Sequence, residues 1–440
     1  MHKIRGAAIM SFVCRGSGQL PGSGGRDAVE PGQAYRPGTN GKPKVARLGL
    51  LCPPRPDSRA RREPVRMHVK IAITKSTLRI PPTYFAVAHA EHLKGSHDFR
   101  VFTLVAEIQD KSITVPITDF VPGQLLGFRR RELVMPAFMP AMTLAVRRYK
   151  PDIVHQHFGT WSRPAVEAAR LSGTPLITTL HGSDVVSLAN PADTMMAKWH
   201  HRNVLAASAQ SQRLLAVSNY LAGRATALGM DADKIEVHYQ GVDTDYFAPG
   251  AREERETPIV LFVGTLNTQK GIRDLIDASL AVWRKARHRL VVIGDGPLRD
   301  AVKEQAASHP HIDFLGRLDR EAIRGWMQKA HVLVAPSQEA GGAREAAGLV
   351  VLEAQACGTP VLAYRSGGIP EMLDDGTTGL LAGEADYSQL RDGLLELLSL
   401  GDAGYQDMRG AARRFVVENR SLAVSAEQLD AHYRMVGARA

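Results

Sequence analysis

EAAGLVVLEAQACGTPVLAYRSGGIPE, residues 345–371, is the stretch that decides how this chain folds. Its apolar run predicts a buried helix that starts at Gly348 and stops at Gly358, with a proline beyond the stop. A short apolar strand follows over residues 361–364, and the glycine pair after it leads into another helix start. Alternation of helix with short buried strand is typical of an open α/β sheet.

Two glutamates, Glu345 and Glu353, stand on either side of that helix start with seven residues between them. A helix start is a ready anion site, because free backbone N–H groups and the positive end of the helix dipole point at a ligand there. One carboxylate before such a site and another inside the helix suit a ligand that carries both phosphates and sugar hydroxyls. The alternative interpretation is two exposed glutamates on an amphipathic helix.

The same alternation of β-rich and helical patterns continues outward through residues 67–440, which indicates doubly wound α/β domains. Since single cores usually split above ~250–300 residues, a chain of 440 residues is expected to form two domains. Strands are predicted in the first domain at residues 69–74, 99–105, 153–157, 175–180 and 214–217. Strands are predicted in the second domain at residues 258–264, 289–293, 312–315, 331–335 and 361–364.

Several ordered motifs together resemble glycosyltransferase family 4. They are the spaced glutamates with ACGTPV and GGIPE, the D-x-V-H-x-H strand at 152–157, and the H-G-x-D element at 181–184. The resemblance implies a GT-B architecture, in which two Rossmann-like domains face each other across a cleft and the C-terminal helix crosses back to the first domain. The domains that it implies are residues 67–245 on the acceptor side, 258–405 on the nucleotide-sugar side, and C-terminal helices over 406–440.

The resemblance also implies a retaining transfer of a sugar from a nucleotide diphosphate sugar to an acceptor hydroxyl. It assigns His181 and Glu345 as the catalytic residues that face the sugar. The donor-binding residues that it assigns are Lys270, Gly264, Thr265, Gly348, Leu349, Val350 and Glu353, with Glu353 on the ribose. Gly294 and Arg317 match positions around the nucleotide base.

Two departures from the family pattern affect the donor phosphates. The family's basic pair is represented by Lys270, but its partner arginine, usually directly after the glycine, is Thr265 here. The loop expected after the first strand, Thr74-Lys75-Ser76, carries none of the paired glycines that family members often have there. Lys75 is a candidate to supply the missing phosphate contact.

No metal or other cofactor is expected. His155 and His157 point the same way along a strand, as a metal pair would, but no third ligand of suitable spacing follows, so a structural role is favoured. Asp243-Thr244-Asp245 has the D-x-D pattern, yet its place just before a linker makes a metal role improbable.

Charge separates the chain into two parts. Residues 1–66 hold 13 Lys+Arg against 4 Asp+Glu, whereas the remaining residues hold 42 against 41. The basic balance therefore belongs to residues 1–66, and nucleic acid is not expected as a partner. Because 18 of these 66 residues are Gly or Pro, we expect a disordered tail or a start-site artefact, with the functional protein beginning near Met67.

The location predicted from the sequence is cytoplasmic. Beyond residue 66 only Cys357 occurs, which fits a reducing compartment, and no run of 18 apolar residues predicts a membrane span. Residues 121–150 mix Arg129, Arg130 and Arg131 with methionines and phenylalanines. The favoured interpretation is a solvated turn beside a core helix, and the alternative is a patch that rests on an anionic membrane surface. The acceptor implied by the resemblance is a glycan or a lipid-linked intermediate of polysaccharide or glycolipid assembly.

Two other functions compete with sugar transfer. One is a nucleotide-sugar epimerase with the GT-B fold, although such enzymes lack the two glutamates in this arrangement. The other is a catalytically silent partner of a transferase, suggested by Thr265 and by the missing glycines.

Overall fold

The structure is a computed structural model of the chain that describes residues 68–81, 83–121, 128–251 and 257–438, with the side chains of 128–133 outside the description. All described residues belong to one compact unit, residues 64–440. The expectations about residues 1–66 therefore lie outside the described residues.

The first sheet is parallel throughout, and its strands lie in the order β3-β2-β1-β4-β5-β6-β7. The strands are β1 (Lys70–Ile80), β2 (Asp98–Ile108), β3 (Ile117–Asp119), β4 (Ile153–His157), β5 (Leu176–Leu180), β6 (Arg213–Ala216) and β7 (Ile235–Val237). The chain order reverses between β1 and β4. In doubly wound sheets, ligands bind at the carboxyl ends of the strands beside such a reversal.

The second sheet repeats this order as β10-β9-β8-β11-β12-β13 and is also parallel. Its strands are β8 (Ile259–Val263), β9 (Arg289–Ile293), β10 (Ile312–Gly316), β11 (Val332–Ala335), β12 (Val361–Tyr364) and β13 (Gly379–Ala382). The reversal here lies between β8 and β11. Two Rossmann-like sheets are what the sequence predicted.

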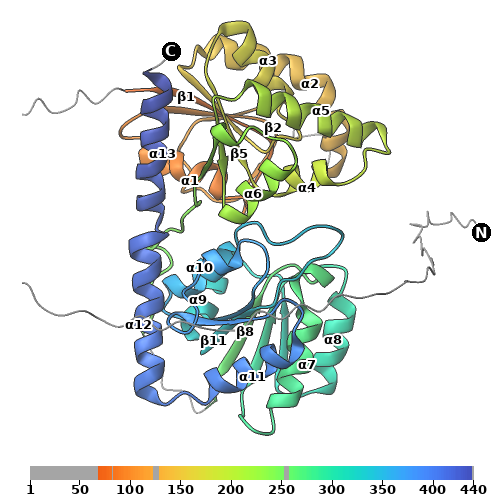
Figure 1. Cartoon of the computed structure of the whole chain (residues 1–440), viewed down its shortest axis with the longest axis vertical. Coiled ribbons are helices and arrows are strands. Elements are labelled where there is room, and N and C mark those ends of the chain that lie inside the picture. Colours follow the sequence, from red (N-terminus) through yellow and green to blue (C-terminus); the bar gives the residue numbers. More distant parts are fainter. Residues whose placement is uncertain (1–67, 82, 122–127, 252–256, 439–440) are drawn as a thin grey trace, which may run out of the picture. The chain divides into compact units, whose positions relative to one another are not determined.

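Helices cover both faces of each sheet (Figure 1). Those of the first sheet are α1 (Phe85–Leu93), α2 (Phe128–Tyr149), α3 (Arg163–Ser172), α4 (Ser183–Ala189), α5 (Met195–Gln210) and α6 (Asn219–Ala227). Those of the second are α7 (Ile272–Val282), α8 (Arg299–Ser308), α9 (Arg320–Lys329), α10 (Leu349–Ala356) and α11 (Tyr387–Leu398). Short 3₁₀ turns are η1 (Ala232–Lys234), η2 (Thr268–Lys270) and η3 (Ile369–Glu371).

Two final helices connect the sheets. Helix α12 (Asp402–Asn419) packs against α10, and α13 (Leu422–Gly437) packs against α1 (Figure 1). Leu429 and Tyr433 of α13 are buried in one apolar cluster with Ile71 of β1. The crossing of the last helix back to the first sheet is therefore confirmed.

The start of the first sheet differs from the expectation. Thr74-Lys75-Ser76 was predicted as a loop, but β1 continues to Ile80 and keeps pairing with β2, for example Thr77 with Val105. The extension is stable because Leu78 and Ile80 are fully buried on it. Lys75 consequently lies within a strand. The short strands β3 and β7 were not anticipated.

The segment 121–150 contains the predicted core helix, but the turn predicted beside it is wrong, because residues 129–131 lie in the same helix. Its described part forms the single helix α2, in which Met135, Met139 and Met142 are buried against the first sheet. The methionines assigned to a membrane patch are thus core residues, and that part of the alternative is wrong. The backbone of Arg129–Arg131 lies in α2, but the side chains of these arginines are outside the described residues.

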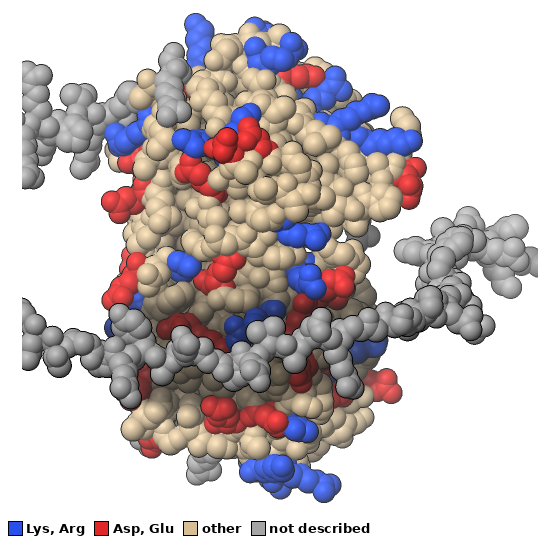
Figure 2. Space-filling view, viewed as in Figure 1, with Lys and Arg blue, Asp and Glu red and all other residues tan. Residues whose placement is uncertain are grey.

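Charge on the described surface is mixed. Figure 2 shows acidic and basic side chains interspersed over the face that it draws, as the near-equal counts beyond residue 66 imply. In the described ranges, no helix has both the length and the apolar character to cross a membrane.

Candidate active site

The start of α10, at Gly348, has the form that the sequence predicts. Gly348 precedes α10 with a φ of 72°, a left-handed conformation that favours glycine. The first N–H groups of any helix have no intrahelical acceptor, and Leu349 and Val350 are only partly buried. This leaves backbone donors of α10 available to an anion.

Glu345 and Lys270 form an ion pair at this helix start. Glu345 lies in the loop before α10, and Lys270 ends the turn η2 that follows β8. The η2 turn lies tightly against the loop after β11, since a Cβ on Gly271 would come within 1.9 Å of the Pro336 carbonyl oxygen. The fold thereby joins two residues that are 75 positions apart in the chain.

The residues assigned to phosphate and base contacts lie at the ends of β8, β9 and β10. Gly264 and Gly294 touch through their backbones, because a Cβ on Gly294 would lie 1.9 Å from the Gly264 oxygen. Thr265 is exposed beside them. Arg317 is exposed and lies 3.8 Å from a carboxylate oxygen of Asp295. These four predicted residues share one edge of the second sheet.

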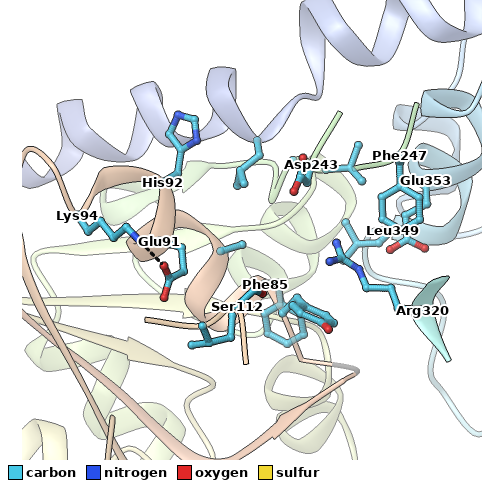
Figure 3. A pocket seen from close by; sticks show the side chains of 16 residues that line it. Phe85, Glu91, His92, Lys94, Ser112, Asp243, Phe247, Arg320, Leu349 and Glu353 are labelled. Carbon is cyan, nitrogen blue, oxygen red and sulfur yellow. Dashed lines mark hydrogen bonds and ion pairs between the residues drawn. The ribbon is translucent and has the colours of Figure 1, made fainter. Parts of the chain in front are cut away.

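A pocket of about 390 Å³ opens beside α10. Glu353 and Leu349 line it from one side, and Glu91 and His92 of α1, with Lys94 just after that helix, line it from the other (Figure 3). Burial raises the pKa of Glu353 to about 7, against the opposing charge of Arg320. A carboxyl group on the pocket wall can accept hydrogen bonds from ligand hydroxyls when it is ionised.

Sequence reasoning missed Arg320, the first residue of α9. Its guanidinium lies 4.1 Å from the ring centroid of Tyr84 and 4.0 Å from that of Tyr246, so it is held by both rings. Figure 3 shows Arg320 reaching the side of the pocket that carries Glu353. Nothing in the local sequence marks this residue, because its two aromatic partners come from distant segments.

His181 lies at the carboxyl end of β5, and both of its ring nitrogens are bonded within the protein. Nδ1 accepts from Nε2 of Gln240 at 2.9 Å, and Nε2 lies 3.0 Å from Nδ1 of His157. The ring also stacks on Phe158 with 4.3 Å between centroids. Burial first, and then the charge of Lys75, holds the pKa of His181 well below its usual range. The ring is therefore neutral near pH 7.

The loop that carries His181 is fixed by Asp184, which is fully buried. Its carboxylate accepts backbone hydrogen bonds from Gly159, Gly182 and Val185 at 3.0–3.2 Å. Burial raises the pKa of Asp184, and these N–H groups oppose that rise. The aspartate of the H-G-x-D element is thus a scaffold for the loop.

The structure brings the two predicted catalytic residues into one neighbourhood. A Cβ on Gly182, which follows His181, would lie 2.8 Å from Cβ of Ala346, which follows Glu345. Ser218 Oγ donates to the Ala346 carbonyl at 2.6 Å and reinforces this approach. Glycine at 182 is needed for the close contact, and its φ of 107° also favours glycine.

The residues of the two patterns considered for metal binding make hydrogen bonds within the fold. His155 is bonded to the Tyr433 hydroxyl and to Thr179 Oγ1, each at 2.7 Å. Asp243 accepts backbone hydrogen bonds from Asp245 and Tyr246 in a turn. In the part of the chain that the structure describes, no three His, Cys, Asp or Glu side chains are grouped as a metal site.

Family models match both halves of the chain. Residues 83–246 match "Glycosyltransferase Family 4", and residues 257–400 match "Glycosyl transferases group 1". A D-inositol 3-phosphate glycosyltransferase of Kribbella flavida is 30% identical over 332 residues, which are 68% of this chain and 76% of that protein. A glycogen synthase of Mycobacterium tuberculosis is 28% identical over 61% of this chain. That match covers 65% of the relative's own length, less than two thirds.

Solved structures share the fold. The Anabaena protein Alr3699/HepE, crystallised in complex with UDP and glucose, superposes with a TM-score of 0.67 at 18% identity. The superposition covers 83% of this chain and 99% of that one. The two-sheet arrangement is therefore that of known GT-B glycosyltransferases.

Proposed function

Because the chain belongs to glycosyltransferase family 4, we propose that it transfers a sugar from a nucleotide diphosphate sugar to an acceptor hydroxyl with retention of anomeric configuration. The observation that carries this proposal is the ion pair between Lys270 and Glu345 at the start of α10. An ammonium suits a phosphate and a carboxylate suits sugar hydroxyls. The pair therefore marks the point where the sugar and the diphosphate of a donor would join.

The chemistry follows from these positions. The bond from the anomeric carbon to the phosphate oxygen breaks, and Lys270 with the N–H groups of Leu349 and Val350 stabilises the charge that grows on the diphosphate. The acceptor oxygen attacks from the face that the diphosphate leaves, and its proton passes to the departing phosphate. Glu345 and neutral His181 position the sugar. No carboxylate is assigned as a nucleophile, so no covalent intermediate is part of this proposal.

The donor would lie along α10. Glu353, one turn after Leu349, would take the ribose hydroxyls, while Gly294 and Arg317 would border the base. UDP is the first nucleotide to test, because the structural neighbour Alr3699/HepE is described in complexes with UDP and with UDP-glucose. Arg320 faces the same pocket and would contact the nucleotide beside Glu353.

The acceptor is proposed to be a glycan or a lipid-linked intermediate in polysaccharide or glycolipid assembly. This follows the family resemblance of the segments around His157 and His181. An enzyme that acts on such an acceptor in the cytoplasm would need contact with the inner membrane face, and Arg129, Arg130 and Arg131 are the residues proposed for it.

The test is donor hydrolysis by the purified chain with a panel of UDP-, GDP- and ADP-sugars. Release of sugar with retained configuration from one donor, lost in Glu345→Gln, supports the proposal. An altered but unreleased sugar indicates an epimerase. Binding of a nucleotide without turnover in any condition, including a panel of glycan acceptors, indicates a silent partner and contradicts the proposal.

A further inference from the structure

Lys75 lies in the first sheet where the strand order reverses, between β1 and β4. It lies on β1 beside Thr74, which pairs with Gln156 near the end of β4, so Lys75 is at the carboxyl edge between the two strands. This edge is where doubly wound sheets bind ligands. Phe158, directly after β4, forms the other side, and the Lys75 ammonium lies 4.7 Å from the centroid of its ring.

Among the described residues, no counter-charge lies beside the buried ammonium of Lys75. The residue is only 6% exposed, and its Nζ donates one hydrogen bond, of 2.7 Å, to the Thr77 carbonyl. An ammonium has three donors, so this bond uses one of them. Among the described residues no carboxylate lies within ion-pairing distance of it. Taking such a charge out of water costs several kcal/mol unless a partner offsets it.

The surroundings of Lys75 make this burial costlier still. Its neighbours with ionisable side chains are His157 and His181, and the charge of Lys75 contributes to the lowered pKa of both. Burial lowers the pKa of Lys75 itself to about 8. A methionine of similar length would fill the same space without this cost. Within the described residues, the charge of Lys75 therefore does not stabilise the fold.

The backbone at Phe158, next to Lys75, has an uncommon conformation. Phe158 has a φ of 66°, which is rare for a side chain of its size. Gln156 holds it there by donating from Nε2 to the Phe158 carbonyl at 2.9 Å. The Phe158 ring therefore contacts both residues: the Lys75 ammonium lies over it, and the ring of His181 stacks on it. Lys75 is thus close to His181, the residue assigned to the transferred sugar.

We propose that Lys75 binds an anionic group, a phosphate or a carboxylate, of one of the two substrates at the reversal of the first sheet. This inference rests on the proposed function for the identity of those substrates. The anion has two possible sources. It is either the donor diphosphate, for which Lys75 would replace the arginine that is Thr265 here, or a phosphate or uronate on the acceptor.

The test measures equilibrium binding to the full chain of four probes: UDP, inorganic pyrophosphate, inorganic phosphate and glucuronate. Lys75→Met removes the charge, and Lys75→Arg keeps it. Lys70→Met is the matched control, because Lys70 lies on the same strand over an aromatic ring, that of Tyr149 at 4.3 Å, but at the amino end. Lys75→Met should weaken its probe roughly 10- to 100-fold, the effect of losing a hydrogen bond to a charged group. Lys75→Arg should retain most binding, and Lys70→Met all of it.

The pattern of losses identifies the source. Weaker UDP and pyrophosphate binding assigns the anion to the donor, and weaker phosphate or glucuronate binding alone assigns it to the acceptor. Equal binding of all probes by Lys75→Met, or no binding to the unmodified chain, overturns the inference. If UDP fails to bind while phosphate binding still depends on Lys75, the inference stands and the proposed donor is wrong. Thermal unfolding of Lys75→Met should occur at the same or a higher temperature, which shows that it folds.

Discussion

Gln240 donates a 2.9 Å hydrogen bond from Nε2 to Nδ1 of His181, and this bond fixes the tautomer of the histidine. Since Nδ1 accepts, the ring proton is on Nε2, which donates to Nδ1 of His157. The tautomer of His181 therefore depends on a residue that lies 59 positions away in the chain.

Replacing Gln240 with glutamate should make His181 easier to protonate. A carboxylate beside Nδ1 favours the imidazolium, so the pKa of His181 should rise from its lowered value. If the neutral ring serves the sugar, the acid limb of the pH profile of kcat/KM should move upward by roughly 1 to 2 pH units. Gln240→Asn should leave the limb in place, and superimposable profiles for Gln240→Glu would show that this contact does not tune His181.

Glu345→Gln should abolish most turnover and leave the fold intact. The amide cannot form the ion pair with Lys270 or accept from sugar hydroxyls as a carboxylate does, and the residue lies in a loop outside the core. We expect at least about a 100-fold fall in kcat, comparable to the loss of one preorganised group. Initial rates and thermal unfolding check this. Glu321→Gln, at a side chain 83% exposed, is the control and should retain full activity.

Glu353→Gln should raise the KM for the donor roughly 10- to 100-fold, because a hydrogen bond from ribose to a charged carboxylate is lost. The kcat should change little, since the ribose is remote from the bond that breaks. Steady-state kinetics with varied donor measures both constants. An unchanged donor KM would contradict the ribose contact.

The same substitution should have a stability signature that tests the burial of Glu353. The pKa of Glu353 is raised from 4.5 in the unfolded chain to about 7 in the folded chain. Between these two pH values the folded state therefore keeps a proton on Glu353 that the unfolded state has lost. This contribution to stability is present below pH 4.5 and disappears as pH rises toward 7. As the pH rises from 4.5 to 7, the free energy of unfolding of the unmodified chain should fall by up to about 3 kcal/mol relative to that of Glu353→Gln. Urea unfolding across this pH range measures the difference.

Glu371→Ala should destabilise the contact between the two sheets' loops. The Glu371 carboxylate accepts from the backbone N–H groups of Asn219 and Tyr220 at 2.7 and 2.9 Å, at the start of α6, and from the Tyr239 hydroxyl at 2.8 Å. Leaving these donors unpaired should lower the free energy of unfolding by about 1–3 kcal/mol. Urea unfolding of the full chain tests it, and Glu304→Ala at an exposed position should change almost nothing.

Replacing Arg129, Arg130 and Arg131 together by glutamine should weaken binding to anionic vesicles. Each basic residue near such a surface contributes ~1 kcal/mol, and salt screens the attraction. The chain beginning at Met67 should therefore bind phosphatidylserine vesicles at low salt and release as salt rises. Donor hydrolysis should be unaffected by the triple substitution. Equal vesicle binding by the unmodified chain and the triple variant would show that these arginines do not contact the membrane.

Local sequence patterns predicted the ends of individual helices and strands, because nearby residues decide them. Gly348 and Gly358 set the ends of α10, and the apolar run at 361–364 became β12 with the expected bounds. The two Rossmann-like domains and the crossing of α13 followed from the resemblance of the whole motif set. The pairing of Glu345 with Lys270 was implied only through a shared ligand, yet the structure shows direct contact.

Long-range contacts were beyond the sequence. The length of β1 depends on its pairing with β2, which buries Leu78 and Ile80 and turns an expected loop into strand. Arg320 gains its place from Tyr84 and Tyr246, which lie in other segments. The buried methionines of α2 could not be told from a membrane-facing patch until the helix had a sheet to pack on.

The crossing of α13 has a consequence for biosynthesis. Leu429 and Tyr433 complete the apolar cluster that β1 and α1 begin, so the first sheet lacks part of its core while the ribosome is still making the second. Domains of a growing chain generally fold in the order of their synthesis. In this protein the half made second can be finished first, and the half made first must wait, partly uncovered, for the helix that closes it. Its early strands are therefore the segment that a nascent-chain chaperone would need to shield.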